Sequence, residues 1–346
     1  MTGVPDSNLA AAQADLLTAL SEGNLVRQRL LQTLVDCGGD ILLYRPDRDH
    51  YAIQLGALEH TRHVAVMVPG VGDDTTLCRD WVPSAHNLFS AAASTTVIMW
   101  KGYDNPSSIV AAAIGSVECN DHLMAAGGSL AAFVQSLPLR KHHSVTIVAH
   151  SFGSLVTGAA LADHDLQVTD VVVAGSPGMS VDGLRELHLS SAHFFSEEAP
   201  GDAIAELGIF GASPTSPLFG GTRMRTNAPG HVEVHSHSNY FAPDSEALAN
   251  IVNVVTGRYT QIERHRSTVP EIAGGAVSWA MRLPTEPVRM VGQRYRGPGF
   301  RVAANAIRFV DFAAARAEEF VRDAVEEAED VLAWMAQHVG GGPAAT

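Results

Sequence analysis

The sequence predicts an α/β fold with a mostly parallel sheet and helices on both of its faces. Two observations lead to this prediction. Short apolar runs rich in β-branched residues alternate with helical stretches, and a serine turn lies directly between one such run and a helix. Strands joined by helices of this length need crossover connections, which are right-handed and build parallel sheets that are covered on both faces. The predicted strands and helices span residues 41–44, 51–55, 63–68, 95–100, 108–137, 144–149, 154–162, 168–174 and 192–196.

Helical extensions are predicted at both ends of this unit. Leucines recur at roughly helical intervals within residues 1–38, and Glu22-Gly23-Asn24 interrupts them, so we expect a helical hairpin. Residues 39–257 form the predicted α/β domain, and residues 258–299, which contain four helix-breaking prolines, form a connector. Residues 300–346 are predicted to form a long helix with apolar positions spaced by three and four residues, followed by a loose tail. Its apolar seam would pack on the N-terminal helices or, alternatively, form a homodimer or a coiled coil with a partner.

Composition narrows the class of protein. With 346 residues and 46% hydrophobic content, the chain can bury one large core or a core with a smaller helical unit. Its net charge of −14 provides no broad positive field, which argues against nucleic acid as a partner. We expect a soluble, cytoplasmic protein, because the sequence shows neither a secretory signal nor an apolar stretch of about 18 residues. Cys37, Cys78 and Cys119 are isolated from one another, so ordinary buried thiols are expected.

Ser151 is the predicted nucleophile. The apolar run 145–149 is followed by a small-x-Ser-x-Gly turn and then by a helix-compatible stretch, as in the nucleophile elbow of the α/β-hydrolase fold. Small residues at Ala149 and Gly153 are needed because the elbow brings the helix and strand backbones together. The same turn points the helix N-terminus toward the developing oxyanion, so the backbone N–H of Phe152 is predicted to stabilise it.

A serine nucleophile needs a base and an acid that orients the base, and in this fold they follow the serine in the order acid, histidine. The loop after the predicted strand 192–196 contains three carboxylates. We select Asp202 as the acid, since Glu197 and Glu198 lie nearer the strand end. For those two glutamates the simpler interpretation is a solvated charge pair.

The candidate bases lie in residues 231–240. In a strand, His231, Glu233, His235 and His237 would point the same way, which raises the alternative of a metal site. Four successive ligands on one face of a strand span too far to converge on one ion, so a single catalytic histidine with surface neighbours is the simpler interpretation.

The second oxyanion donor is expected in the glycine-rich loop after the predicted strand 63–68. Glycines let a backbone approach a substrate closely, and we select the N–H of Val71, with Gly70 as the adjacent alternative. An ordinary strand-to-helix turn would have the same composition.

With these motifs in this order, the chain resembles an actinobacterial α/β-hydrolase family long catalogued as a domain of unknown function. The resemblance covers roughly residues 40–256 and implies that Ser151, Asp202 and His237 form a catalytic triad. The chain has Ala149 and Ser236 where members of that family usually carry glycine. The motifs that carry the resemblance are Val68-Pro69-Gly70-Val71-Gly72, Trp100-Lys101-Gly102-Tyr103-Asp104, His150-Ser151-Phe152-Gly153-Ser154, Gly175-Ser176-Pro177-Gly178, Ala199-Pro200-Gly201-Asp202, and His237-Ser238-Asn239-Tyr240 ahead of Asp244-Ser245.

The sequence therefore predicts a serine hydrolase that acts on a small-molecule carboxylic ester through an acyl-enzyme and needs no cofactor. A thioesterase, an amidase or an acyltransferase would use the same three residues. An alternative from a different class is a catalytically silent protein that keeps the fold and binds partners.

Overall fold

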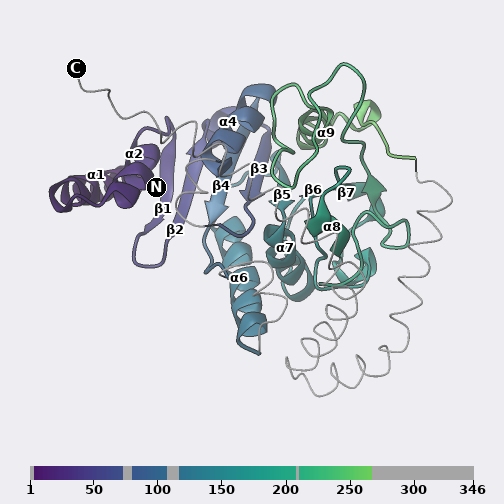
Figure 1. Cartoon of the computed structure of the whole chain (residues 1–346), viewed down its shortest axis with the longest axis horizontal. Coiled ribbons are helices and arrows are strands. Elements are labelled where there is room, and N and C mark those ends of the chain that lie inside the picture. The colour runs from purple at the N-terminus through teal and green to yellow at the C-terminus, as the bar shows by residue number, and fades with distance from the viewer. Residues whose placement is uncertain (1–3, 73–79, 107–116, 208–209, 267–346) are drawn as a thin grey trace, which may run out of the picture.

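The computed structural model describes residues 4–72, 80–106, 117–207 and 210–266. Its described residues form an eight-stranded sheet with the strand order β1-β2-β4-β3-β5-β6-β7-β8. The sheet runs through the middle of the molecule (Figure 1). Its strands are β1 (Asp40–Arg45), β2 (His50–Leu55), β3 (His63–Val68), β4 (Thr95–Lys101), β5 (Ser144–His150), β6 (Asp170–Ala174), β7 (Phe194–Glu197) and β8 (Thr222–Arg223).

Most of the sheet is parallel. Every neighbouring pair from β4 through β3, β5, β6 and β7 to β8 runs in the same direction. At one edge, β1 pairs antiparallel with β2, and β2 pairs antiparallel with β4. The mostly parallel α/β sheet predicted from the sequence is therefore confirmed, and β5 lies inside it, between β3 and β6.

Helices cover both faces of the sheet (Figure 1). Helices α6 (Val117–Ser136) and α7 (Phe152–Asp163) lie on one face, and α4 (Val82–Ala91) and α9 (Glu246–Val255) lie on the other. The strands read as continuous apolar runs because both of their faces are buried. Successive residues of β5 show this, since Ile147 belongs to the cluster under α6 and α7, whereas Val148 belongs to the cluster under α4 and α9.

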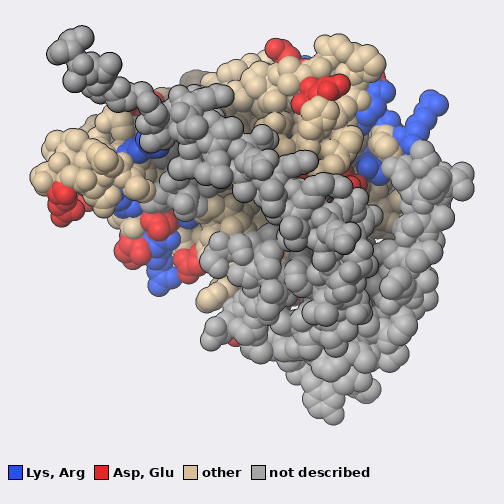
Figure 2. Space-filling view, in the orientation of Figure 1, with Lys and Arg blue, Asp and Glu red and all other residues tan. Residues whose placement is uncertain are grey.

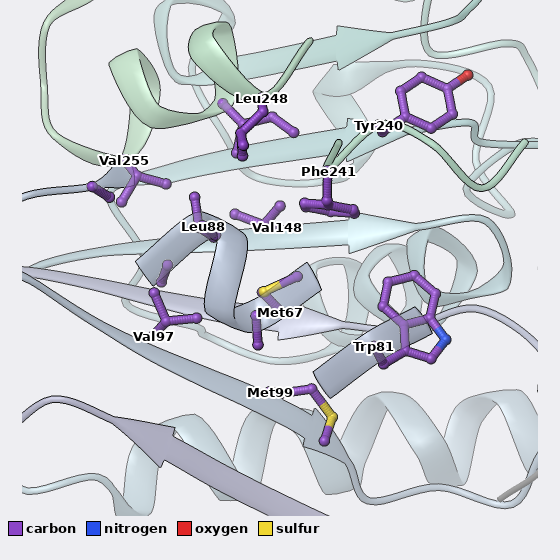
Figure 3. Packing of buried hydrophobic residues seen from close by; sticks show 14 of the residues in the cluster. Met67, Trp81, Leu88, Val97, Met99, Val148, Tyr240, Phe241, Leu248 and Val255 are labelled. Atoms are coloured by element: carbon purple, nitrogen blue, oxygen red, sulfur yellow. The ribbon is translucent and has the colours of Figure 1, made fainter. Parts of the chain in front are cut away.

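The second of these clusters lies close to the site described below. Figure 3 shows Leu88 of α4 and Leu248 of α9 against Val148, together with Trp81, Tyr240 and Phe241. Trp81 and Tyr240 thus link the packed interior to residues at the carboxyl end of β5.

Two helices, α1 (Val4–Glu22) and α2 (Leu25–Val35), precede the sheet and lie beside its β1 edge (Figure 1). The helical hairpin predicted there is confirmed, with its interruption at residues 23 and 24. The side chain of Asn24 caps α2 by accepting a hydrogen bond from the N–H of Arg27 at 3.1 Å. The predicted connector beyond residue 266 and the C-terminal helix with its apolar seam lie outside the described residues.

The remaining described helices are short: α8 (Ala203–Leu207), and 3₁₀ turns at Leu58–His60, Leu184–Glu186, Ser191–His193 and Tyr259–Gln261. Within the described ranges, no helix is long and apolar enough to cross a membrane. On the face shown in Figure 2, Lys and Arg side chains lie beside Asp and Glu side chains at the end that carries α1 and α2, so this part of the surface is mixed in charge.

Candidate active site

Ser151 lies on a sharp turn between β5 and α7. Its φ is 52° and its ψ is −126°, a conformation that costs a residue other than glycine about 1–3 kcal/mol. Its N–H donates to the carbonyl oxygen of Ala174 at 3.1 Å, which ties the turn to β6. A side chain at Gly153 would collide with the carbonyl oxygen of Val68, so only glycine lets α7 approach β3 this closely. The turn is the strained elbow that the sequence predicts.

The structure brings the three predicted residues of the site together. His237 Nε2 lies 2.7 Å from Ser151 Oγ, and His237 Nδ1 lies 2.9 and 3.0 Å from the two carboxylate oxygens of Asp202. A carboxylate accepts hydrogen bonds, so Nδ1 carries the proton and Nε2 is left as the acceptor for the serine hydroxyl. The side chain of His237 is 20% exposed, whereas that of Asp202 is fully buried. Solvent therefore reaches His237 but not Asp202.

Buried hydrogen bonds keep Asp202 ionised. Its Oδ2 accepts a hydrogen bond from Tyr240 Oη at 2.6 Å, and its Oδ1 accepts one from the N–H of Ala205 at 3.0 Å. Burial by itself would raise the pKa of Asp202, but the hydrogen bonds from His237, Tyr240 and Ala205 outweigh it and hold the pKa below its usual range. The carboxylate is therefore charged at neutral pH and able to orient the imidazole of His237.

The backbone at Gly175 packs closely against Asp202 and His237. Gly175 follows β6 with a φ of 58°, in the left-handed region that favours glycine. A Cβ atom there would lie 2.8 Å from Asp202 Oδ2 and 3.1 Å from His237 Nδ1. Asp202 and His237 thus meet directly over the backbone that follows β6.

His150 contacts His237 through a hydrogen bond and through its ring. It is buried, and its Nε2 donates to the carbonyl oxygen of His237 at 2.5 Å. Its ring lies 4.6 Å from the ring of His237 and 5.1 Å from that of Trp81. Burial, followed by repulsion from a protonated His237, lowers the pKa of His150 to about 3, so this ring stays neutral beside His237.

The two segments that contain the predicted oxyanion donors meet at the serine. Phe152 is the first residue of α7, and its ring is buried. Val71 lies in the loop after β3, where the backbone at Gly70 packs on the serine: a Cβ atom at Gly70 would lie 2.7 Å from Ser151 Cβ and 3.2 Å from Ser151 Oγ. The loop and the helix N-terminus therefore meet at Ser151 from two sides.

Residues 46–212 match the model of a family described as alpha/beta hydrolase. The chain has the α/β-hydrolase fold. The family resemblance predicted from the sequence is confirmed, and so is the α/β-hydrolase fold.

Relatives of this α/β-hydrolase chain occur in mycobacteria. An uncharacterized protein of Mycobacterium tuberculosis is 26% identical over 295 residues, which cover 72% of this chain and 44% of the relative. The chain therefore spans less than half the length of this relative.

Two solved structures are similar in outline. An esterase from Thermogutta terrifontis shows 11% identity and a TM-score of 0.40, covering 65% of this chain and 94% of the esterase. A cutinase from Trichoderma reesei shows 18% identity and a TM-score of 0.33, covering 56% of this chain and 76% of the cutinase.

The side chains of the two competing acids lie in surroundings that differ from those of Asp202. Glu197 is the last residue of β7 and is completely buried, and Glu198 accepts hydrogen bonds from Thr215 at 2.6 Å and Arg223 at 3.3 Å. The interpretation of these glutamates as a solvated charge pair is therefore wrong. Alternation along β7 turns the side chain of Glu197 into the cluster under α9, where burial and the charge of Glu246 raise its pKa well above the usual range.

The competing histidines are also separated from the serine. His235 Nε2 pairs with Glu233 at 2.6 Å on an exposed stretch, and His231 Nδ1 lies 3.2 Å from the carbonyl oxygen of Asp244. The described residues 231–240 contain no strand, so the shared face on which the metal alternative depended does not form there.

Sequence reasoning assigned no role to Tyr240 or His150, and it placed Tyr103 only within a segment, residues 100–106, that ends a predicted strand and could shape the substrate pocket. Each acts through a contact with a residue more than 30 positions away in the chain, which leaves no local periodicity to detect. The available signal was their presence in motifs that the chain shares with the family it resembles.

Proposed function

We propose that the protein is a serine hydrolase that cleaves carboxylic esters through an acyl-enzyme. The observation that carries this proposal is the continuous hydrogen-bonded chain from buried Asp202 through His237 to the hydroxyl of Ser151. It joins a nucleophile, a base with the correct tautomer and a charged acid, which is the arrangement required for acyl transfer.

In the first half of the reaction, Ser151 Oγ attacks the ester carbonyl carbon while its proton moves to His237 Nε2. Asp202 stabilises the imidazolium that forms and stays ionised itself. The negative charge that develops on the carbonyl oxygen is received by the backbone N–H groups of Val71 and Phe152, both fixed before the reaction begins. His237 then gives its proton to the leaving alkoxide, so that the alcohol departs and the serine carries the acyl group.

The second half repeats these steps with water. His237 takes a proton from a water molecule, the resulting hydroxide attacks the acyl-enzyme, and the proton returns to Ser151 Oγ as the carboxylic acid leaves. All proton transfers occur between groups of this chain, the substrate and water, so the sequence of steps needs no cofactor.

The test combines an active-site label with a substrate panel. A fluorophosphonate should label the wild-type protein covalently, and p-nitrophenyl esters of graded chain length should be hydrolysed. Ser151→Ala should remain folded, take no label and lose about three to six orders of magnitude in turnover. Ser238→Ala removes an exposed serine hydroxyl one residue from the base and is the matched control, with label and turnover retained.

Two results would count against the proposal. A well-folded wild-type protein that takes no label would favour the catalytically silent binding protein instead. A Ser151→Ala variant that keeps most of its activity would move the nucleophile elsewhere. Thioester and amide substrates in the same panel distinguish ester hydrolysis from the related reactions that use the same three residues.

A further inference from the structure

The segment that follows β4 lies against the loop that follows β3. These two strands are parallel neighbours, so their carboxyl ends meet at the same edge of the sheet. The segment after β4 contains Tyr103 and Asn105, and the loop after β3 contains Gly70, Val71 and Gly72. None of the steps proposed above uses Tyr103 or Asn105.

Tyr103 donates its hydroxyl proton into the loop. The residue is buried, and its Oη lies 2.5 Å from the carbonyl oxygen of Pro69 and 3.3 Å from that of Gly70. Burial raises the pKa of Tyr103, so the hydroxyl stays protonated and remains a donor throughout the pH range of activity. One proton shared between two successive carbonyl groups fixes the direction of both peptide units.

Asn105 holds the next part of the loop. Its Nδ2 donates to the carbonyl oxygen of Gly72 at 2.5 Å. Carbonyl groups on both sides of Val71 are therefore held by side chains from a single neighbouring segment. Because two of the loop residues are glycines, the loop backbone would otherwise have wide conformational freedom.

Fixing these carbonyl groups also fixes the N–H of Val71. In a planar trans peptide the C=O and N–H groups point in opposite directions, so a Gly70 carbonyl directed at Tyr103 sends the N–H of Val71 away from it. The backbone of Gly70 also packs on Ser151, since a Cβ atom added at Gly70 would lie 2.7 Å from Ser151 Cβ.

The same tyrosine touches the second donor residue. Its ring stacks on that of Phe152 with centroids 6.2 Å apart and planes 29° apart, and it packs against Trp100 at 5.9 Å. The ring cannot shift without disturbing the start of α7, so Tyr103 links the two predicted oxyanion donors to each other.

We propose that Tyr103 and Asn105 are positioning residues for the oxyanion hole, which hold the loop so that the N–H of Val71 faces the reacting carbonyl oxygen. This assignment rests on the proposed function. A preorganised donor stabilises the transition state more than the bound substrate, because the full charge on oxygen appears only there. Removing the hydrogen bond of Tyr103 or that of Asn105 to the loop should therefore lower kcat and leave KM nearly unchanged.

The test compares Tyr103→Phe and Asn105→Ala with wild type in the full-length protein. Tyr103→Phe keeps the ring packing and removes only the hydroxyl. Its kcat should fall about 10- to 100-fold, less than the roughly 10²–10³-fold cost of deleting a donor outright, and KM should change less than about twofold. Asn105→Ala should change kcat in the same direction by a smaller factor.

A transition-state analogue gives a readout that a merely structural role would not move. A trifluoromethyl ketone forms a tetrahedral adduct with its oxyanion in the hole, so its Ki should rise by the same factor by which kcat falls. Tyr259→Phe is the matched control: its hydroxyl bonds Asp170 at 2.9 Å at the amino end of β6, away from Ser151. That variant should keep wild-type kcat and Ki.

Three outcomes would overturn the assignment. Wild-type kcat and Ki in both Tyr103→Phe and Asn105→Ala would show that the two residues position nothing, even if Ser151 is labelled as expected. A rise in KM with kcat unchanged would point to substrate contact instead. A wild-type protein that takes no fluorophosphonate label would overturn the proposed function, and this assignment with it.

Discussion

Removing the hydroxyl of Tyr240 should damage both the stability and the pH dependence of the protein. Tyr240 is fully buried, donates to Asp202 at 2.6 Å and accepts from the N–H of Ala199 at 2.8 Å. The bond to the charged carboxylate is worth about 1.5–3 kcal/mol and the neutral one about 1 kcal/mol. Tyr240→Phe keeps the ring and should lower the free energy of unfolding by about 2.5–4 kcal/mol, or the Tm by roughly 5–15 °C.

The sign of the pH effect follows from the charge on Asp202. Although burial opposes it, hydrogen bonding holds the pKa of this carboxyl below its usual range, so these bonds stabilise the fold at neutral pH and the contribution is lost as pH falls. Without the Tyr240 hydroxyl the pKa of Asp202 rises. The acidic limb of kcat/KM should therefore move to higher pH, and the stability gap between the two proteins should narrow in acid.

Chemical denaturation at pH 7.5 and pH 4, together with a pH–rate profile, measures both effects. Tyr44→Phe is the control, because its hydroxyl also bonds a carboxylate, Asp15 at 2.5 Å, but at the N-terminal helices rather than at the site. The reasoning is refuted if Tyr240→Phe unfolds at the wild-type denaturant midpoint, or if its acidic limb stays in place.

Three further predictions concern neighbouring positions. Gly175→Ala places a Cβ atom against Asp202 and His237 at a residue with positive φ, so it should lower kcat by at least about tenfold in a folded protein. An unchanged kcat would contradict the close approach of Gly175 to these two side chains. Glu197→Gln should flatten the pH dependence of Tm. Burial, helped by Glu246, raises the pKa of Glu197 in the folded state, so wild type should lose stability as pH rises above the ordinary glutamate pKa of about 4.3, while the variant should not. His237→Ala should lose nearly as much activity as Ser151→Ala, whereas His235→Ala should reduce activity only slightly. EDTA should have no effect on activity. Chelator-sensitive activity would favour the metal alternative instead.

The sequence predicts those parts of the fold that depend on local pattern. The strand, turn and helix around Ser151 lie within about 20 residues, and each has a distinct periodicity, so the elbow can be located from the sequence alone. Pairing partners are not local, and nothing in the run 51–55 indicates that β2 pairs antiparallel with β4. Glu197 was interpreted as solvated because glutamate is rarely buried, and only packing against residues distant in the chain, such as Glu246 of α9, explains why this one is buried.

The side chains that support the site were beyond prediction for the same reason. Asp202 could be selected because the fold dictates the order of acid and histidine along the chain, and His237 could be selected among three nearby histidines because residues 237–240 resemble a family motif. The contact of His150 with His237 spans 87 residues and that of Tyr103 with Pro69 spans 34, and both depend on how distant segments of the chain meet in space.

The strained backbone that positions the hydroxyl of Ser151 for the proposed reaction lowers the thermodynamic stability of the protein. A serine at φ 52° is held there by the surrounding packing at a cost of about 1–3 kcal/mol, whereas glycine would adopt the same backbone angles without that penalty. Mutational drift toward greater stability therefore favours inactive sequences at this position. Ser151→Gly should melt at a higher temperature than Ser151→Ala, which retains the strain, and calorimetry on the two inactive variants measures the difference directly.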